Sequence, residues 1–277
     1  MYDTLFLYNK YYMETIMIGI LREFFGVGGY QREPEGYFSW QHLTFVTILV
    51  VIMIILAVMF GLKNKNKELS IKNKVLIIAA ILIDGFEIFK IIVFCLNANS
   101  FEPILYNLPL FLCSIQLITI PLAAFSKGKV KEASLDFVFI FGLLGAILGT
   151  YLAGNNYAAY PVLSFTNVVS GITHCISGFA SLYIVISGMC SMKKQNIWIT
   201  FTILLVFGVL AYISNISFGG NYMFLMQGDG TPYDILYNLV NGNKVIYPIL
   251  VMVLFLIYIS IFYYVFFIIK NRKIKKN

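Results

Sequence analysis

The chain has 277 residues, of which 60% are hydrophobic and only 12% are charged. Soluble domains are about half apolar and about a quarter charged, so this composition excludes an ordinary soluble protein and predicts one embedded in a bilayer. The formal net charge of +7 does not indicate a nucleic-acid partner, because the basic residues lie in short clusters between apolar runs, as they do beside anionic lipid headgroups.

The first 41 residues are predicted to lie outside the bilayer. Tyr12–Phe25 mixes apolar side chains with three charged ones, which is typical of an amphipathic helix lying on a membrane surface. The stretch GVGGYQREPEG follows it, and its glycines and polar residues predict a link into the first transmembrane span.

Seven apolar runs are long enough to cross a membrane, and they predict an all-α bundle over residues 42–270, followed by a basic tail over residues 271–277. The expected spans are Leu43–Leu62, Val75–Asn97, Leu108–Phe125, Leu135–Leu152, Thr166–Ser187, Ile197–Ile216 and Val245–Ile269. The connector Ser217–Lys244 is rich in glycine and polar residues, which predicts an outer loop over the mouth of the bundle.

The basic residues are divided unevenly between the two sets of connectors. Fifteen of the twenty lie in Lys63–Lys74, Ser126–Leu135, Ser191–Asn196 and Lys270–Asn277. The positive-inside rule then predicts a multi-pass protein of the cell membrane with an extracytoplasmic N-terminus and a cytoplasmic C-terminus. Anionic lipids are expected at the cytoplasmic loops.

The four cysteines all lie within or at the end of apolar runs. They are Cys95, Cys113, Cys175 and Cys190. There is no CxxC pair, so the pattern indicates neither a disulfide framework nor a zinc site, and no metal or soluble cofactor is expected.

A stripe of polar and small residues follows one face of the fifth expected span. Its members are Asn167, Ser170, Gly171, His174, Ser177, Gly178 and Ser181. One interpretation is close helix packing with interhelical hydrogen bonds. The imidazole of His174 is larger than such an interface needs and is suited to proton transfer, which favours a functional site there.

The second expected span carries Asp84, Glu87 and Lys90, although charges are costly at mid-membrane. Glu87 and Lys90 are three residues apart, so they are able to pair on one helix face. Three interpretations stay open: an internal ion pair that anchors the bundle, a proton relay, and a carboxylate that orients His174.

Cys113 and Gln116 are also three residues apart, on the third expected span. A lone buried cysteine usually packs as a small hydrophobe, but a cysteine with a histidine in reach is able to form an acyl-thioester. Helix rise is compatible with Cys113, His174 and Glu87 meeting in the outer half of one bundle. Gln116 or Asn215 is expected to donate a hydrogen bond to the developing oxyanion.

Close helix packing, with no chemistry, is the expected role of three glycines in the fourth span. They are Gly142, Gly145 and Gly149.

Several short motifs resemble those of the YwaF-type integral membrane proteins, a family related to the transmembrane protein 164 acyltransferase. They are WQHL (Trp40–Leu43), LPLFLCSIQLI (Leu108–Ile118), the pair Thr173–His174 with Leu182–Tyr183 after it, and NYMFL (Asn221–Leu225). The resemblance runs from about Tyr37 to Ile269. The motif as usually seen has histidine where Phe111 stands, and a second histidine often stands where Cys175 does.

The resemblance implies that Cys113 accepts an acyl group and that His174 is its base. It also implies a structural or substrate-facing role for His42 and Asn221. Phospholipids and lysophospholipids are the implied partners. The leading hypothesis is therefore a membrane-embedded phospholipid acyltransferase or esterase that works near the outer leaflet.

Two other classes of protein remain open. An ion-coupled transporter would use Asp84, Glu87 and Lys90, although the sequence has no repeated half-bundle. A non-catalytic membrane partner is the third hypothesis. A retinal protein is disfavoured, because the seventh expected span contains no lysine.

Overall fold

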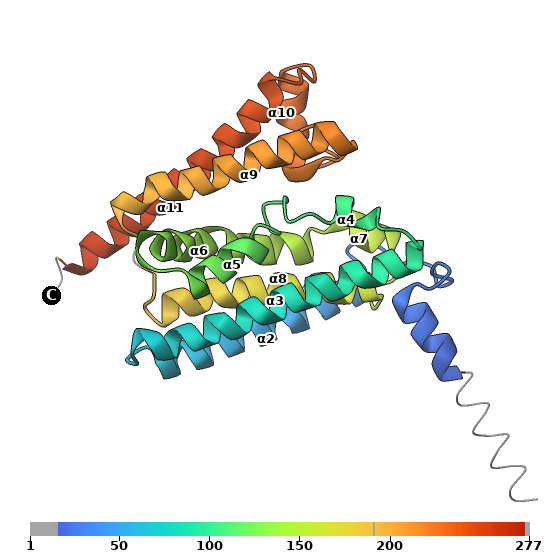
Figure 1. Cartoon of the computed structure of the whole chain (residues 1–277), viewed down its shortest axis with the longest axis horizontal. Coiled ribbons are helices and arrows are strands. Elements are labelled where there is room, and N and C mark those ends of the chain that lie inside the picture. The colour runs from blue at the N-terminus through green and yellow to red at the C-terminus, as the bar shows by residue number, and fades with distance from the viewer. Residues whose placement is uncertain (1–15, 191, 275–277) are drawn as a thin grey trace, which may run out of the picture.

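The computed structural model describes residues 16–190 and 192–274, with the backbone alone for residues 270–274. Every regular element in this part of the chain is a helix, which confirms the predicted all-α class (Figure 1). The main helices are α2 (Trp40–Asn64), α3 (Leu69–Ala98), α5 (Gln116–Phe125), α6 (Gly128–Tyr151), α8 (Phe165–Ile186), α9 (Ile197–Phe218) and α11 (Ile246–Ile274). The short ones are α4 (Pro103–Tyr106), α7 (Gly154–Ala159), η1 (Lys194–Asn196), η2 (Tyr222–Phe224) and α10 (Asp234–Leu239).

Five helices of the described chain are long and apolar enough to cross a membrane, so the chain is a multi-pass membrane protein. They are Trp40–Asn64, Gly128–Ala159, Phe165–Ile186, Lys194–Phe218 and Ile246–Ile269. The difference from the seven expected spans arises at α3 and α5. The 30 residues of α3 include Asp84, Glu87 and Lys90 within its apolar part, and α5 has only ten residues.

The helices form layers around α8, which packs against α6, α2 and α3. Figure 1 shows α6 and α8 between the α2–α3 pair and the crossed α9–α11 pair. Helices approach closely where small residues face one another, as predicted. A Cβ added to Gly142 would lie 2.8 Å from the Ser177 carbonyl oxygen, so α6 and α8 are in backbone contact there.

The expected third span, Leu108–Phe125, is not one continuous helix, and this corrects the prediction. Only α5 is regular, and an irregular stretch with a turn over residues 111–115 precedes it. Pro109 supplies no backbone N–H to a helix. The neighbouring Leu108 amide instead donates to the Tyr222 hydroxyl at 3.1 Å, so a distant loop satisfies the backbone here.

One end of the bundle is covered by residues 26–39 and is called the linker end. The opposite end, which carries the α2–α3 loop of residues 65–68 and the lysines on either side of it, is called the lysine end. Residues 16–25 are helical, and residues 12–15 of the predicted interfacial helix lie outside the described chain. Phe24 and Phe25 pack against Phe165 at the start of α8, with ring centroids 5.8 and 5.0 Å away.

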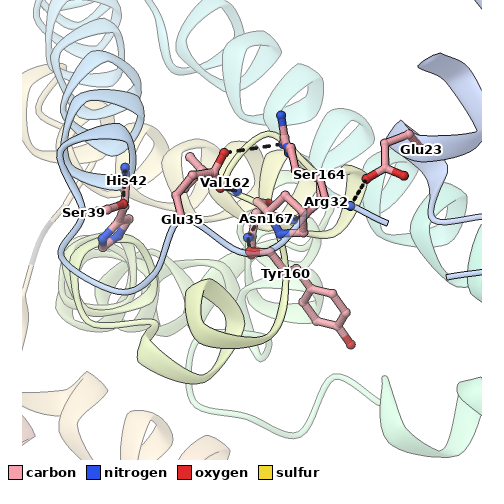
Figure 2. A network of polar contacts seen from close by, with 10 residues as sticks. Glu23, Arg32, Glu35, Ser39, His42, Tyr160, Val162, Ser164 and Asn167 are labelled. Atoms are coloured by element: carbon pink, nitrogen blue, oxygen red, sulfur yellow. Dashed lines mark hydrogen bonds and ion pairs between the residues drawn. The ribbon is translucent and has the colours of Figure 1, made fainter. Parts of the chain in front are cut away.

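Polar contacts fold the linker onto the bundle. Glu35 accepts a hydrogen bond from the Val162 amide at 2.7 Å, and Glu23 accepts one from the Arg32 amide at 3.1 Å (Figure 2). The predicted polar link is therefore an ordered cover over the first turn of α8.

A buried carboxylate joins three helices near the lysine end. Asp136 on α6 is fully buried and accepts hydrogen bonds from Asn196 at 2.7 Å and from the Tyr263 hydroxyl on α11 at 3.0 Å. Asn196 directly precedes α9, so this network fixes α9 and α11 to α6. The Cys190 thiol donates to the same carboxylate at 3.5 Å.

Candidate active site

A small cavity of about 50 Å³ lies between α3, the start of α5 and α8. It is lined by Ile83, Glu87, Lys90, Cys113, Ser114, Leu117, Ser170, Thr173, His174 and Ser177. The fold therefore brings Cys113, His174 and Glu87 together, from three different elements. A water molecule takes about 30 Å³ of liquid, so the cavity is the size of a reacting group and not of a lipid chain.

The His174 imidazole has a defined tautomer. Its Nδ1 lies 2.7 Å from the Ser170 carbonyl oxygen, one turn earlier on α8. A carbonyl oxygen only accepts, so Nδ1 carries a proton, and in the neutral imidazole Nε2 keeps the lone pair. Cys113 lines the same cavity as this imidazole, and Nε2 is the nitrogen left to meet its thiol.

Two glycines of α6 make room for this pair. A Cβ on Gly149 would overlap Nε2 and Cδ2 of His174, and a Cβ on Gly145 would lie 3.3 Å from the Cβ of Cys113. Positions 145 and 149 are one turn apart on a single face of α6. These glycines were expected only to pack helices, but they also shape the site.

Cys113 lies in the turn that leads into α5. The Ile115 amide donates to the Phe111 carbonyl at 2.9 Å, which closes one helical turn around the cysteine. Within the described chain, the amides of Cys113 and Ser114 have no backbone acceptor. Such first-turn amides carry the positive end of the helix dipole, which favours negative charge on a thiol or an oxyanion there.

Glu87 and Lys90 form an ion pair at 2.7 Å, with side chains 13% and 15% exposed. The predicted pairing on one helix face is therefore confirmed. The contact that would orient His174 is made by the Ser170 carbonyl oxygen at Nδ1 and not by Glu87. Glu87 lines the cavity as half of a neutral pair.

The amides proposed from sequence as oxyanion donors lie elsewhere. Gln116 is fully buried at the start of α5 but does not line the cavity, and its Oε1 accepts a hydrogen bond from Thr119 at 3.1 Å. Asn215, at the end of α9, makes two hydrogen bonds to the backbone of Tyr222, at 3.0 and 2.6 Å. Asn215 thus holds the loop that follows α9.

Asn221 shapes the same loop. Its Nδ2 donates to the Gln227 carbonyl at 2.9 Å and to Asp229 at 2.6 Å, and its Oδ1 accepts from the Met226 amide at 2.9 Å. These contacts satisfy both ends of the side-chain amide. Of the two roles implied for Asn221, structural and substrate-facing, this geometry fits the structural one.

His42 is fully buried near the start of α2 and has partners for both ring nitrogens. Nδ1 accepts from the Phe38 amide at 3.2 Å, so Nε2 carries the proton and donates to the Thr150 carbonyl at 3.1 Å. The ring also stacks on Tyr157, with centroids 3.8 Å apart. This imidazole has no free lone pair and does not line the cavity.

Phe111, which stands where the motif usually has histidine, packs in an aromatic cluster outside the cavity of Cys113 and His174. Its ring packs on Tyr222 at 5.0 Å and on Phe224 at 6.2 Å between centroids. The motif segments LPLFLC and NYMFL are therefore in contact with each other. Phe111 does not line the cavity that holds Cys113 and His174.

Sequence reasoning missed Ser114, Thr173 and the two glycines as parts of the site. Ser114 and Thr173 adjoin the two candidate residues in the chain, and the four-residue spacing of the glycines matches a helix face, so weak signals were present. In the sequence, only Pro109 indicated that the chain before α5 would not form a continuous helix through Cys113.

Searches of characterised proteins and of solved structures give no match to this chain. The family model of the TMEM164 family matches residues 37–264, which is most of the chain and includes every residue of the cavity. The chain therefore belongs to the TMEM164 family.

Proposed function

We propose that this protein is a membrane-embedded acyltransferase or esterase that moves a fatty-acyl group from a phospholipid through a thioester on Cys113. The observation that carries the proposal is that Cys113 and His174 line one small cavity, with an imidazole proton held on Nδ1 by the Ser170 carbonyl. A thiol beside an imidazole with a free lone pair is the minimum arrangement for this chemistry.

In the first half-reaction, His174 Nε2 removes the thiol proton and the thiolate of Cys113 attacks the ester carbonyl carbon. The tetrahedral oxyanion is stabilised by the amides of Cys113 and Ser114 at the start of α5. Its collapse breaks the ester C–O bond, and the imidazolium returns the proton to the departing alkoxide. A lysophospholipid leaves, and the acyl group stays on sulfur.

In the second half-reaction, an acceptor hydroxyl attacks the thioester carbonyl. His174 takes the proton of the acceptor and gives it to the leaving thiolate, so the cysteine is regenerated. A lysolipid acceptor gives acyl transfer, and water gives hydrolysis. The small cavity holds the reacting carbonyl group of the ester. The acyl chain of the substrate lies outside it, between the helix surface and the surrounding bilayer lipids.

The topology that suits this function has seven crossings in the cell membrane, with the segment before α5 and the charged helix α3 as two of them. The linker end would be extracytoplasmic and the lysine end cytoplasmic, where anionic lipids meet the basic loops. Single cysteines at Lys65 and at Asp229, in a variant whose four native cysteines are replaced by alanine, test this with an impermeant thiol reagent in intact cells. Labelling of the second site alone is expected, and the reverse would contradict the orientation.

The experiment for the function is lipid turnover by purified protein in vesicles of defined phospholipid, followed by mass spectrometry of the lipids. Cys113→Ala and His174→Ala are expected to remove turnover, while Cys95→Ala, a change at a cysteine outside the cavity, keeps it. Turnover that survives Cys113→Ala would overturn the thioester route. If Glu87→Gln removed activity while Cys113→Ala had only a mild effect, the result would instead support an ion-coupled transporter.

A further inference from the structure

A second cavity, of about 710 Å³, lies at the linker end and shares no lining residue with the catalytic cavity. Its walls are the helical residues 16–25, the linker and the segment just before α8. The polar residues that line it are Arg22, Glu23, Tyr30, Gln31, Arg32 and Ser164. Its volume suits a phospholipid headgroup with its glycerol.

The charged groups of this cavity favour an anion. Both carboxylate oxygens of Glu23 accept backbone amides, from Gln31 and Arg32, each at 3.1 Å, so this carboxylate is already engaged. Arg32 lies 3.6 Å from Glu35 with half of its side chain exposed, and such a pair is weak. Among the described residues, Arg22 makes no ion pair. Two guanidiniums are therefore available, and their planar fork fits a phosphate.

A helix terminus adds to this potential. Ser164 lines the cavity and is the N-cap residue of α8, a helix of 22 residues. The N-terminus of a long helix carries partial positive charge and free amide donors. The positive partial charge at the start of α8 and the charges of the two arginines both favour a bound anion.

The remaining wall is apolar and continues into exposed apolar surface. Ile20 and Leu163 line the cavity and are 63% and 55% exposed. Met17 and Ile18 are 57% and 54% exposed on the same short helix. Side chains of this kind beside the first turn of a transmembrane helix are stabilised by the acyl region of a bilayer.

We infer that this cavity binds the headgroup of an anionic phospholipid, with the phosphate between Arg22 and Arg32 and the acyl chains along the apolar wall. The site anchors the linker end to the membrane. The inference is independent of the chemistry at Cys113, because the two cavities share no residue.

The test is titration calorimetry of the full chain in detergent, carrying Cys113→Ala so that no turnover consumes the probe. The probes are dihexanoyl phosphatidylglycerol, dihexanoyl phosphatidylcholine, glycerol phosphate and inorganic phosphate. We expect the phosphatidylglycerol to bind at least about tenfold more tightly than each of the other three. Arg22→Gln/Arg32→Gln should remove that preference.

Lys244→Gln is the matched control, because Lys244 is an exposed basic residue beyond the cavity at the same end of the bundle. It should keep the preference, and the unfolding temperature of each variant checks that folding is intact. Equal binding of both lipids, or a preference that survives the double substitution, would overturn the inference. Equal binding of inorganic phosphate and phosphatidylglycerol would assign the site to free phosphate and would also overturn it.

Discussion

The two histidines of the chain meet adjacent residues of α6 and yet lie in opposite environments. His42, from α2, bonds the Thr150 carbonyl and holds its proton on Nε2, whereas His174, from α8, packs on Gly149 and holds its proton on Nδ1. His42 has a protein partner for each nitrogen, whereas the second nitrogen of His174 is left for the thiol of Cys113, which lines the same cavity. The partners of an imidazole, more than its burial, decide whether it is able to act as a base.

Exchanging each histidine for alanine should give the largest and most opposed effects. His174→Ala removes the base and is expected to slow acylation of Cys113 by about 10²–10⁴-fold with little loss of stability. His42→Ala removes a fully buried side chain and leaves the buried Thr150 carbonyl and the Phe38 amide without their partners, so it should cost about 2–4 kcal/mol of unfolding free energy. Single-turnover acylation rates and thermal unfolding separate the two. Equal losses of acylation rate in the two variants would contradict the assignment of a chemical role to His174 and a structural role to His42.

Gly149→Ala changes the surroundings of His174 from the side of α6. Its new Cβ would overlap the His174 ring and displace Nε2 from the thiol, so acylation should fall by about 10²-fold. Gly85→Ala is the control, because Gly85 is also helical and a Cβ there meets nothing within 4 Å. The ratio of the two rates is the measurement. A full rate in Gly149→Ala would show that close packing at this position does not set the imidazole geometry.

The Glu87–Lys90 pair should matter mainly for stability. Glu87→Gln leaves a buried ammonium unpaired and is expected to cost about 3–5 kcal/mol, whereas the double variant Glu87→Gln/Lys90→Met should be nearly neutral. Unfolding in detergent measures both free energies. If Glu87→Gln/Lys90→Met were no more stable than Glu87→Gln, the two charges would act separately. An ion-coupling site of a transporter would require this.

Phe111→His should have the smallest effect on chemistry. The new imidazole would face Tyr222 and Phe224 and not the thiol, so the acylation rate should stay within about twofold of the parent. A stability loss of about 1–2 kcal/mol is expected, because an aromatic contact in an apolar cluster is weakened. A rate increase of tenfold or more would place this position within the catalytic geometry.

Much of the helical framework was predictable from the sequence, because apolar runs such as Leu43–Leu62 and Ile197–Ile216 report helices directly. Helix spacing and depth were compatible with a meeting of Cys113, His174 and Glu87 but did not require it. The break before α5 did not, since Tyr222, more than a hundred residues later, provides the hydroxyl that satisfies this backbone. Likewise, only tertiary contacts distinguish Asn215 and Asn221, which hold a loop, from amides that would face a substrate.

The four cysteines supply an internal comparison for the central claim, that Cys113 alone is the acyl acceptor. Burial and the neighbouring Asp136 carboxylate raise the pKa of the Cys190 thiol, so it holds less thiolate at neutral pH than an ordinary cysteine and should react slowly. Cys95 and Cys175 do not line the cavity that holds His174. Of the four cysteines, only Cys113 lines that cavity, and its own amide and that of Ser114 have no backbone acceptor.

The most direct measurement is therefore peptide-level mass spectrometry of all four cysteines after acid quenching of a single turnover with phospholipid. We expect a fatty-acyl mass on Cys113 alone, removed by hydroxylamine and lost in His174→Ala. Acylation spread over several cysteines, or lipid turnover that persists in Cys113→Ala, would contradict it.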